Sequence, residues 1–159
     1  MKKIFLPIIG TAIFIIAVGF LMKSSLVKPS QSTQAQTGTK TIKVGPKILS
    51  VEVADTEAKR QKGLGSKTSL RQDDGMLFVF DQRQTRHTFW MKDMQFDLDI
   101  IWISNGKIVQ IDKDVKTEPG VADYNLRRYS SQVPVDYVLE VSAGFSDKNS
   151  IKVGDIIVL

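Results

Sequence analysis

The sequence predicts a mainly β domain of the α+β class, folded as a compact antiparallel barrel-like or two-sheet structure with one or two short helices. Three observations lead to this prediction. Short apolar or alternating runs, separated by turn residues, follow one another from residue 47 onward. Asn105 and Gly106 separate two such runs, and this pair is a strong hairpin signal because both residues tolerate positive φ. No long amphipathic helix pattern follows residue 40, so the strands must pack mainly against one another.

The first elements of the domain follow from local patterns. Residues 47–54 (KILSVEVA) alternate polar and apolar side chains, which indicates a half-buried strand. Asp55 is placed to cap a short helix over residues 56–62, and Gly63 is placed to end that helix. Residues 75–80 (GMLFVF) are apolar on both faces, which predicts a strand in the centre of a sheet.

Residues 89–103 (FWMKDMQFDLDIIWI) hold the densest run of large apolar side chains outside the N-terminus, and the rest of the domain is expected to pack around them. Further strands are predicted at residues 86–92, 97–103, 107–112, 136–141 and 156–159. A helical turn is predicted within residues 142–149. The longest loop is predicted at residues 117–133, and a loop of that length in a small domain is often functional.

The N-terminal region has a different composition. Residues 4–22 form a run of 19 without a charge, which as a helix rising about 1.5 Å per residue matches the hydrocarbon core of a bilayer. We therefore expect an N-terminal transmembrane helix, with residues 1–23 as a membrane anchor. Residues 24–40, rich in Ser, Thr and Gln, are expected to form a flexible linker. Residues 41–159 are expected to form the globular domain.

A cleaved signal peptide is the alternative to an anchor, because the chain starts with the positively charged Met1-Lys2-Lys3. The apolar run is longer than the usual signal-peptide core, and it meets Lys23 without a small-x-small cleavage site, which favours an uncleaved anchor. A short charged N-terminus before a first apolar segment usually stays cytoplasmic. The expected location is therefore the cell membrane, with a single span and an extracytoplasmic C-terminal domain.

Charge and composition exclude several classes of function. The net charge of +5 comes mostly from residues 1–30, which hold four lysines and no acid, whereas residues 31–159 hold 18 basic and 17 acidic side chains. We expect no nucleic-acid partner, because such a partner requires a basic face. The chain has no cysteine and one histidine, which excludes thiolate and polyhistidine metal sites within one chain. The aspartates between residues 93 and 114 match no EF-hand pattern, so no metal or cofactor is expected.

Five motifs carry a resemblance to a known family. They are GLGSKTSL at 63–70, GMLFVF at 75–80, FWMKDM at 89–94, LDIIWI at 98–103 and VLEVSAG at 138–144. In this order and spacing the chain resembles domain of unknown function 192 (DUF 192), over about residues 47–159. That family comprises small bacterial and archaeal proteins, often preceded by an export or anchoring segment. The resemblance implies a compact, mostly β fold and no established activity.

The chain departs from the family pattern at three positions. Gly65 stands where methionine is typical, Lys67 where arginine is typical, and Asp97 where proline often precedes the Leu-Asp pair. Lysine is a point donor, so a bidentate contact with an oxyanion is not expected at residue 67.

Polar residues within or beside the apolar strands form the candidate ligand pocket. They are Lys67, Trp90, Lys92, Asp99 and Glu140. Asp99 and Glu140 interrupt otherwise apolar runs, and an ionised carboxylate in such a place needs a cation or several hydrogen-bond donors. Two interpretations remain open: a pocket for a small polar ligand, or an ion-pair network that fixes the strand register.

The expected function is a membrane-tethered extracytoplasmic module that binds a small ligand or an envelope component. One alternative is a cell-envelope hydrolase that uses Asp99 and Glu140 as acid and base, the pairing that glycosidases employ. Another alternative is a purely structural assembly module. His87 is the only conventional base near neutral pH, but no nucleophile motif such as G-x-S-x-G accompanies it.

Overall fold

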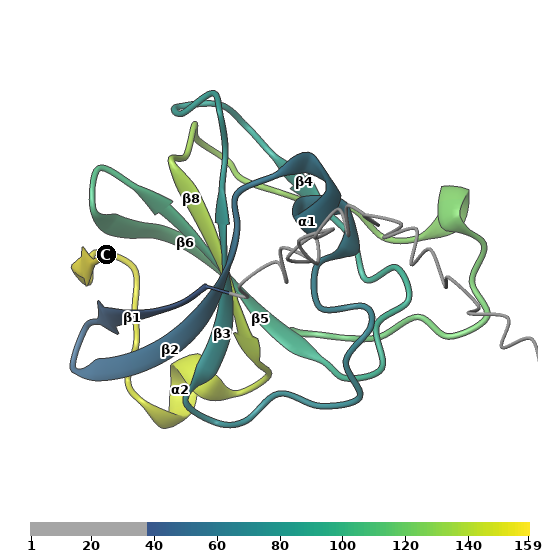
Figure 1. Cartoon of the computed structure of the whole chain (residues 1–159), viewed down its shortest axis with the longest axis horizontal. Coiled ribbons are helices and arrows are strands. Elements are labelled where there is room, and N and C mark those ends of the chain that lie inside the picture. Colours follow the sequence, from purple (N-terminus) through teal and green to yellow (C-terminus); the bar gives the residue numbers. More distant parts are fainter. Residues whose placement is uncertain (1–37) are drawn as a thin grey trace, which may run out of the picture. The chain divides into compact units, whose positions relative to one another are not determined.

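The computed structural model describes residues 38–159, and strands are the main regular elements of this domain (Figure 1). The strands are β1 (Thr39–Val44), β2 (Lys47–Ala54), β3 (Asp74–Val79), β4 (Thr88–Phe89), β5 (Leu98–Ser104), β6 (Lys107–Val115), β7 (Tyr129–Ser130), β8 (Tyr137–Ser142) and β9 (Ile157–Val158). The helices are α1 (Glu57–Lys62) and α2 (Phe145–Lys148), with a 3₁₀ turn, η1 (Asp123–Asn125). The predicted mainly β fold with two short helices is confirmed.

Seven strands form one sheet in the order β6-β5-β8-β3-β2-β1-β9, and β4 pairs with β7 in a separate small sheet. All neighbours in the large sheet are antiparallel except β2 and β3, which are parallel. A parallel pair needs a crossover connection, and α1 lies within that connection. The crossover places α1 beside the ends of β2 and β3.

The large sheet curls into a half-barrel because the C-terminal segment forms backbone hydrogen bonds with β1 on one side and with the start of β6 on the other. β9 pairs with β1, and Ile156 just before β9 forms a bridge with Lys107 at the start of β6. The Ile108 amide donates to the Asp155 carbonyl at 3.0 Å, and the Ile157 amide donates to the Gly106 carbonyl at 2.9 Å. These bonds bring the two outer strands of the sheet together at one end.

The turn between β5 and β6 forms where the sequence predicts it. Asn105 and Gly106 have φ angles of 50° and 70°, as a type I′ turn requires at its two central positions. This turn matches the right-handed twist of the two strands, so local chemistry sets their connection.

Apolar side chains fill both faces of the large sheet. One cluster lies with α2 and includes Ile101, Ile103 and Leu139, and the other lies on the opposite face and includes Ile100 and Val138. Because both faces are covered, all seven residues of β5 are buried. The expected role of the 89–103 run as a packing centre is thus confirmed for residues 98–103, whereas within residues 89–97 only Met91 is buried.

Three local expectations need correction. Thr56, not Asp55, caps α1, because its hydroxyl accepts the Lys59 amide at 3.3 Å, whereas Asp55 forms an ion pair with the Lys59 side chain. The strand predicted over residues 86–92 is limited to β4, because only two residues find a partner strand there. The first strand, β1, starts within the predicted 24–40 linker.

The predicted membrane anchor at residues 1–23 lies outside the described residues. Within residues 38–159, the helices are too short to cross a bilayer.

Candidate ligand pocket

A pocket of about 200 Å³ opens between α1, the end of β3 and the segment that follows β4. Its wall is apolar and largely aromatic, with side chains of Leu64, Phe78, Phe80, Phe89 and Met94. Polar side chains also line it, from Glu57, Arg60, Gln61, Lys62, His87, Thr88, Trp90, Lys92 and Glu140. A pocket that combines an apolar wall with placed polar groups is typical of small-molecule sites.

Glu140 is the most unusual residue of the pocket. It lies in the middle of β8 and is 6% exposed, yet no side chain or backbone group of the described residues forms a hydrogen bond with its carboxyl. Burial raises the pKa of Glu140 to about 8, because the ionised form loses hydration without gaining a partner. At neutral pH this carboxyl is therefore mostly protonated, so it can both donate and accept a hydrogen bond.

The strands on either side hold Glu140 at the pocket. Glu140 pairs in register with Met76 of β3 and Ile100 of β5. Gly75 lets β3 approach closely, because a Cβ atom at this position would lie 2.9 Å from the Glu140 carbonyl oxygen. The backbone of Glu140 is thus enclosed by two neighbours while its side chain faces the pocket.

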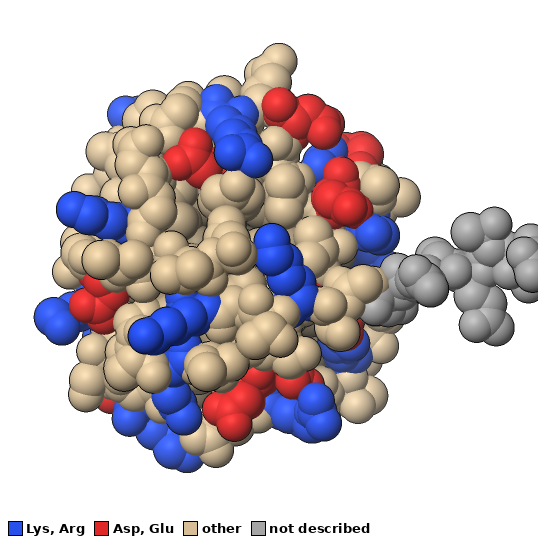
Figure 2. All heavy atoms as spheres, turned by 60° about the vertical axis from the view of Figure 1, so that its left-hand side comes forward, with Lys and Arg blue, Asp and Glu red and all other residues tan. Residues whose placement is uncertain are grey.

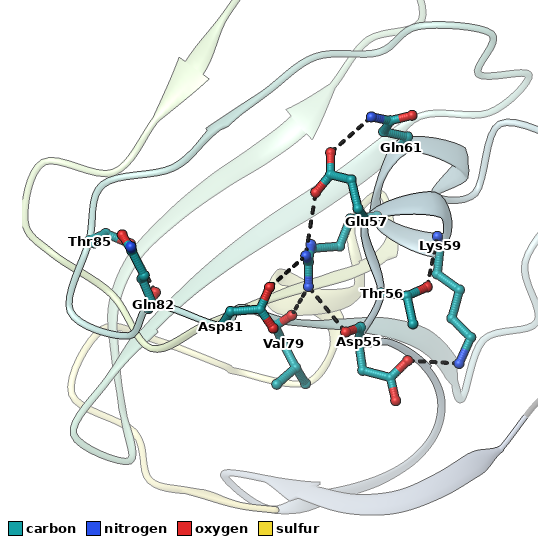
Figure 3. Close-up of polar contacts among 10 residues, drawn as sticks. Asp55, Thr56, Glu57, Lys59, Gln61, Val79, Asp81, Gln82 and Thr85 are labelled. Carbon is teal, nitrogen blue, oxygen red and sulfur yellow. Dashed lines mark hydrogen bonds and ion pairs between the residues drawn. The ribbon is translucent and has the colours of Figure 1, made fainter.

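Arg60 fixes α1 to the end of β3 and so forms one side of the pocket. Its Nη1 donates to the carbonyl oxygens of Val79 at 2.8 Å and Asp55 at 3.2 Å. Its Nη2 donates to the carboxylates of Glu57 at 3.3 Å and Asp81 at 3.2 Å (Figure 3). The planar guanidinium reaches all four acceptors at once, which a lysine could not do.

His87 lies flat against the aromatic wall. Its ring stacks on Phe80 with centroids 3.4 Å apart, and its Nε2 lies 2.8 Å from the Thr85 hydroxyl oxygen. Burial, and to a smaller extent the charge of Arg60, lowers the pKa of His87. The imidazole is therefore neutral at pH 7 and offers the pocket an uncharged polar edge.

Trp90 and Lys92 connect the pocket to the long loop that precedes β7. The Arg128 guanidinium carbon lies 4.3 Å from the Trp90 ring centroid, and Trp90 remains 45% exposed. Lys92 forms an ion pair with Asp123 of η1, and this hydrogen bond raises the pKa of Lys92. Two separate contacts thus hold the loop beside the rim of the pocket.

Three of the five residues predicted to form the pocket line it, namely Trp90, Lys92 and Glu140. Lys67 does not line it, because its ammonium pairs with Glu52 at 2.6 Å. The structure therefore does not bring Lys67 together with Trp90, Lys92 and Glu140.

Asp99 also lies away from the pocket. Its carboxylate is fully buried and accepts backbone amides of Asp114 at 2.9 Å, Gly144 at 3.1 Å and Ser146 at 2.8 Å. It is thus satisfied by the start of α2 and by β6. Alternate residues of a strand point to opposite faces, and Asp99 shares its face with Ile101, not with Glu140. Asp99 and Glu140 cannot flank one substrate bond, as a glycosidase mechanism requires.

Sequence reasoning did not place Arg60, His87 or Phe80 at the pocket. Their proximity depends on the parallel β2–β3 crossover, which carries α1 to the end of β3. No short-range sequence pattern predicts that β2 pairs with β3. Among the described residues, no group of three or more His, Asp or Glu side chains is placed to hold a metal ion.

Comparisons with known proteins agree on the fold. The model of the DUF192 family, described as "Uncharacterized ACR", matches residues 39–159. A crystal structure of a "putative transcription regulator" from Sinorhizobium meliloti has a TM-score of 0.69 and 26% identity, covering 77% of this chain and 94% of that one. A protein of unknown function from Novosphingobium aromaticivorans has a TM-score of 0.68 and 25% identity, covering 76% and 85%. No curated protein matches the chain.

Proposed function

Because the chain belongs to the DUF192 family and holds a pocket around an unpartnered buried acid, we propose that it is a membrane-tethered extracytoplasmic module that binds a small ligand. The observation that carries this proposal is the Glu140 carboxyl, which is buried beside the pocket without a hydrogen-bond partner from the described residues. The fully enclosed side-chain polar atoms without a partner among the described residues are Oγ of Ser131 and Ser146, so the Glu140 carboxyl is not sealed off but reaches the pocket. A ligand in the pocket that bonds to Glu140 would supply the hydrogen-bond partner that this carboxyl lacks.

The pocket limits the chemistry of the ligand. Its volume of about 200 Å³ is below the range typical of sites for drug-sized molecules. The ligand is therefore small, or a single group of a larger envelope component enters the pocket. A neutral Glu140 favours a hydroxyl, carbonyl or amide group at the buried end, and the aromatic wall favours a flat or apolar body.

The tether is supported by the uncharged run of residues 4–22 and by the polar linker that follows it. The regulatory role named for the S. meliloti protein gains no support from the charges of this chain. Residues 31–159, which include the whole described domain, hold 18 basic and 17 acidic side chains, so the domain lacks the strong positive charge of most DNA-binding domains.

The proposal is tested with the full chain in detergent and a library of small hydroxyl- and amide-bearing ring compounds. Binding is measured by the change in tryptophan fluorescence, which is assigned to Trp90 because Trp90 lines the pocket, whereas the only other tryptophan, Trp102, is fully buried. We expect compounds that bind with micromolar to millimolar affinity and lose about tenfold or more in Glu140→Leu, which removes the polar group but keeps an apolar side chain.

Asp147→Asn is the control, because Asp147 is an acid of α2 that does not line the pocket and its side chain is 71% exposed. This variant should bind the same compounds within about twofold. Equal binding by wild type and Glu140→Leu would contradict the proposal. Failure of every compound, together with repeated recovery of one protein partner from membranes, would favour the structural assembly module instead.

A further inference from the structure

The end of the sheet farthest from α1 carries a group of exposed aliphatic side chains, which we call the C-terminal patch. Its members are Ile48, Val153, Ile156, Val158 and Leu159, with exposed fractions of 64%, 58%, 62%, 58% and 36%. Val158 of β9 and Ile48 of β2 both pair in register with Lys43 of β1, so they lie in one row across three strands. Single exposed aliphatic residues are common, but five around one short strand indicate a contact surface.

Basic side chains lie among the members of the C-terminal patch. Lys43 occupies the centre of the row, and Lys107 forms the backbone bridge with Ile156. No acidic side chain of residues 38–159 forms an ion pair with either lysine, whereas Lys47 and Lys152 pair with Asp73 and Asp155. Figure 2 brings this side of the domain forward and shows Lys and Arg among uncharged residues over the middle of the face, with acidic residues nearer its margins.

Building on the membrane tether of the proposed function, we propose that the C-terminal patch docks on the anionic lipid surface of that membrane. Aliphatic side chains can enter the boundary between headgroups and acyl chains, while lysines at the same level bind anionic headgroups. The membrane is favoured over a second copy of the chain. A symmetric contact of the patch with itself would bring Lys43 and Lys107 of both copies together without acidic partners.

The length of the chain before β1 permits this docking. β1 begins at Thr39, at the opposite end of the strand from the turn at Gly45, and its six residues span about 20 Å. Residues 24–38 can span at most about 50 Å when fully extended. The linker can therefore run past β1 and still allow the C-terminal patch to reach the bilayer.

Docking would also orient the pocket. α1 and β4 lie on one side of the domain, and the β1–β2 turn and the C-terminus lie on the other (Figure 1). With the C-terminal patch on the lipid surface, the pocket beside α1 would face the aqueous phase. A ligand would then arrive from solution and not from the bilayer.

The absence of cysteine from the chain makes a site-specific test direct. The full chain is inserted into vesicles of phosphatidylcholine alone or with one quarter phosphatidylglycerol, and an environment-sensitive fluorophore is attached at Val158→Cys. The control probe is at Tyr124→Cys, because Tyr124 is 84% exposed and lies in η1, beside the pocket. We expect a blue shift of the Val158 probe in the anionic vesicles only, lost in 0.5 M salt, and no shift of the Tyr124 probe.

Charge reversal provides the second measurement. Each basic residue near an anionic surface contributes roughly fivefold to binding. The double variant Lys43→Glu, Lys107→Glu should therefore lower the ratio of docked to undocked probe at least tenfold, whereas Lys62→Glu on α1 should leave it unchanged. Lys43, Lys107 and Lys62 are all exposed, so the variants are expected to fold.

Two outcomes would overturn the docking proposal. One is a Val158 probe that is as solvated as the Tyr124 probe in both lipid compositions. The other is a shift that needs no anionic lipid but grows with the density of protein in the vesicles, which would indicate contact between copies. The tether is judged separately by retention of the chain in vesicles after alkaline carbonate. If the chain is released there, the tether proposal fails, and adding anionic vesicles to the free labelled chain still decides docking.

Discussion

Asp99 and Glu140 lie on adjacent strands, one position out of register, and their carboxyl groups point to opposite faces of the sheet. Asp99 accepts three backbone amides on the face covered by α2. Glu140 faces the pocket and finds no hydrogen-bond partner among the described residues. Two acids that look alike in the sequence therefore have different roles: Asp99 holds the fold together, and Glu140 is available to a ligand.

The structural role of Asp99 predicts a large loss of stability in Asp99→Asn. The amide nitrogen of the new side chain would face backbone donors, so at least one buried N–H group would lose its acceptor. We expect the free energy of unfolding to fall by about 2–4 kcal/mol, measured by urea denaturation. Asp147→Asn is the control, because Asp147 lies in α2, the helix whose first amides bond to Asp99, but its side chain is 71% exposed, and it should cost less than about 1 kcal/mol. Equal losses in the two variants would refute the role assigned to Asp99.

The raised pKa of Glu140 predicts a stability that falls as pH rises. In the unfolded chain this carboxyl loses its proton near its ordinary pKa of 4.5, whereas in the folded chain it keeps the proton up to a pKa of about 8. Between these values the folded state binds more protons, so the free energy of unfolding should fall by about 1.4 kcal/mol per pH unit from this group.

Glu140→Gln isolates this contribution, because glutamine has no proton to lose. The difference in unfolding free energy between wild type and this variant should decrease steadily from pH 5 to pH 8, measured by urea denaturation at three or four pH values. Contributions from other titrating groups cancel in the difference. Parallel pH profiles for the two proteins would mean that Glu140 is ionised in the folded state at neutral pH.

Most strands were predictable from the sequence because their signals are local. The Asn105-Gly106 turn depends on two residues that tolerate positive φ, and the β5 run shows its burial directly in its composition. The parallel pairing of β2 with β3 was not predictable in this way, because it joins segments separated by α1 and a loop. The short helical pattern between them predicts α1 but not which strands pair.

The candidate site was only partly predictable for the same reason. Glu140 and Asp99 were both identifiable as acids that interrupt apolar strands. Which of them meets a pocket depends on what covers each face of the sheet, and that is set by α2 on one side and by the α1 crossover on the other. Lys67 was assigned to the site on polarity alone, and its pairing with Glu52 depends on long-range geometry.

The four hydrogen bonds of Arg60 predict that Arg60→Lys will loosen α1 from β3. A lysine can donate to one or two of these acceptors. Either the Val79 carbonyl or the carboxylates of Glu57 and Asp81 would then lose a hydrogen-bond donor. We expect a loss of about 1–2 kcal/mol in unfolding free energy and faster amide hydrogen exchange in α1.

Arg71→Lys is the matched control for this substitution, because the Arg71 side chain is 84% exposed and pairs only with Asp74. It should change the unfolding free energy by less than about 1 kcal/mol. If Arg60→Lys and Arg71→Lys behave alike, the contacts of Arg60 do not hold α1 in place.

Gly75 predicts a steric effect on the strand that carries Glu140. A Cβ atom at residue 75 would lie 2.9 Å from the Glu140 carbonyl oxygen and 3.2 Å from Cδ1 of Leu139, so β3 and β8 would have to separate. We expect Gly75→Ala to lower the unfolding free energy by about 1–3 kcal/mol, and Gly75→Ser to lower it further, because the clash grows with the side chain. Gly75 has no positive φ, so its effect is steric, whereas Gly120→Ala, at a φ of +77° with open space around the Cβ position, measures the cost of backbone conformation alone.

Separation of the strands would also admit water to Glu140, so in Gly75→Ala the pKa of Glu140 should fall toward its ordinary value. The effect of Glu140→Gln on the unfolding free energy should then change less with pH in the Gly75→Ala background than in the wild-type background. An equal pH dependence in the two backgrounds would show that the pocket does not depend on the close contact of β3 with β8.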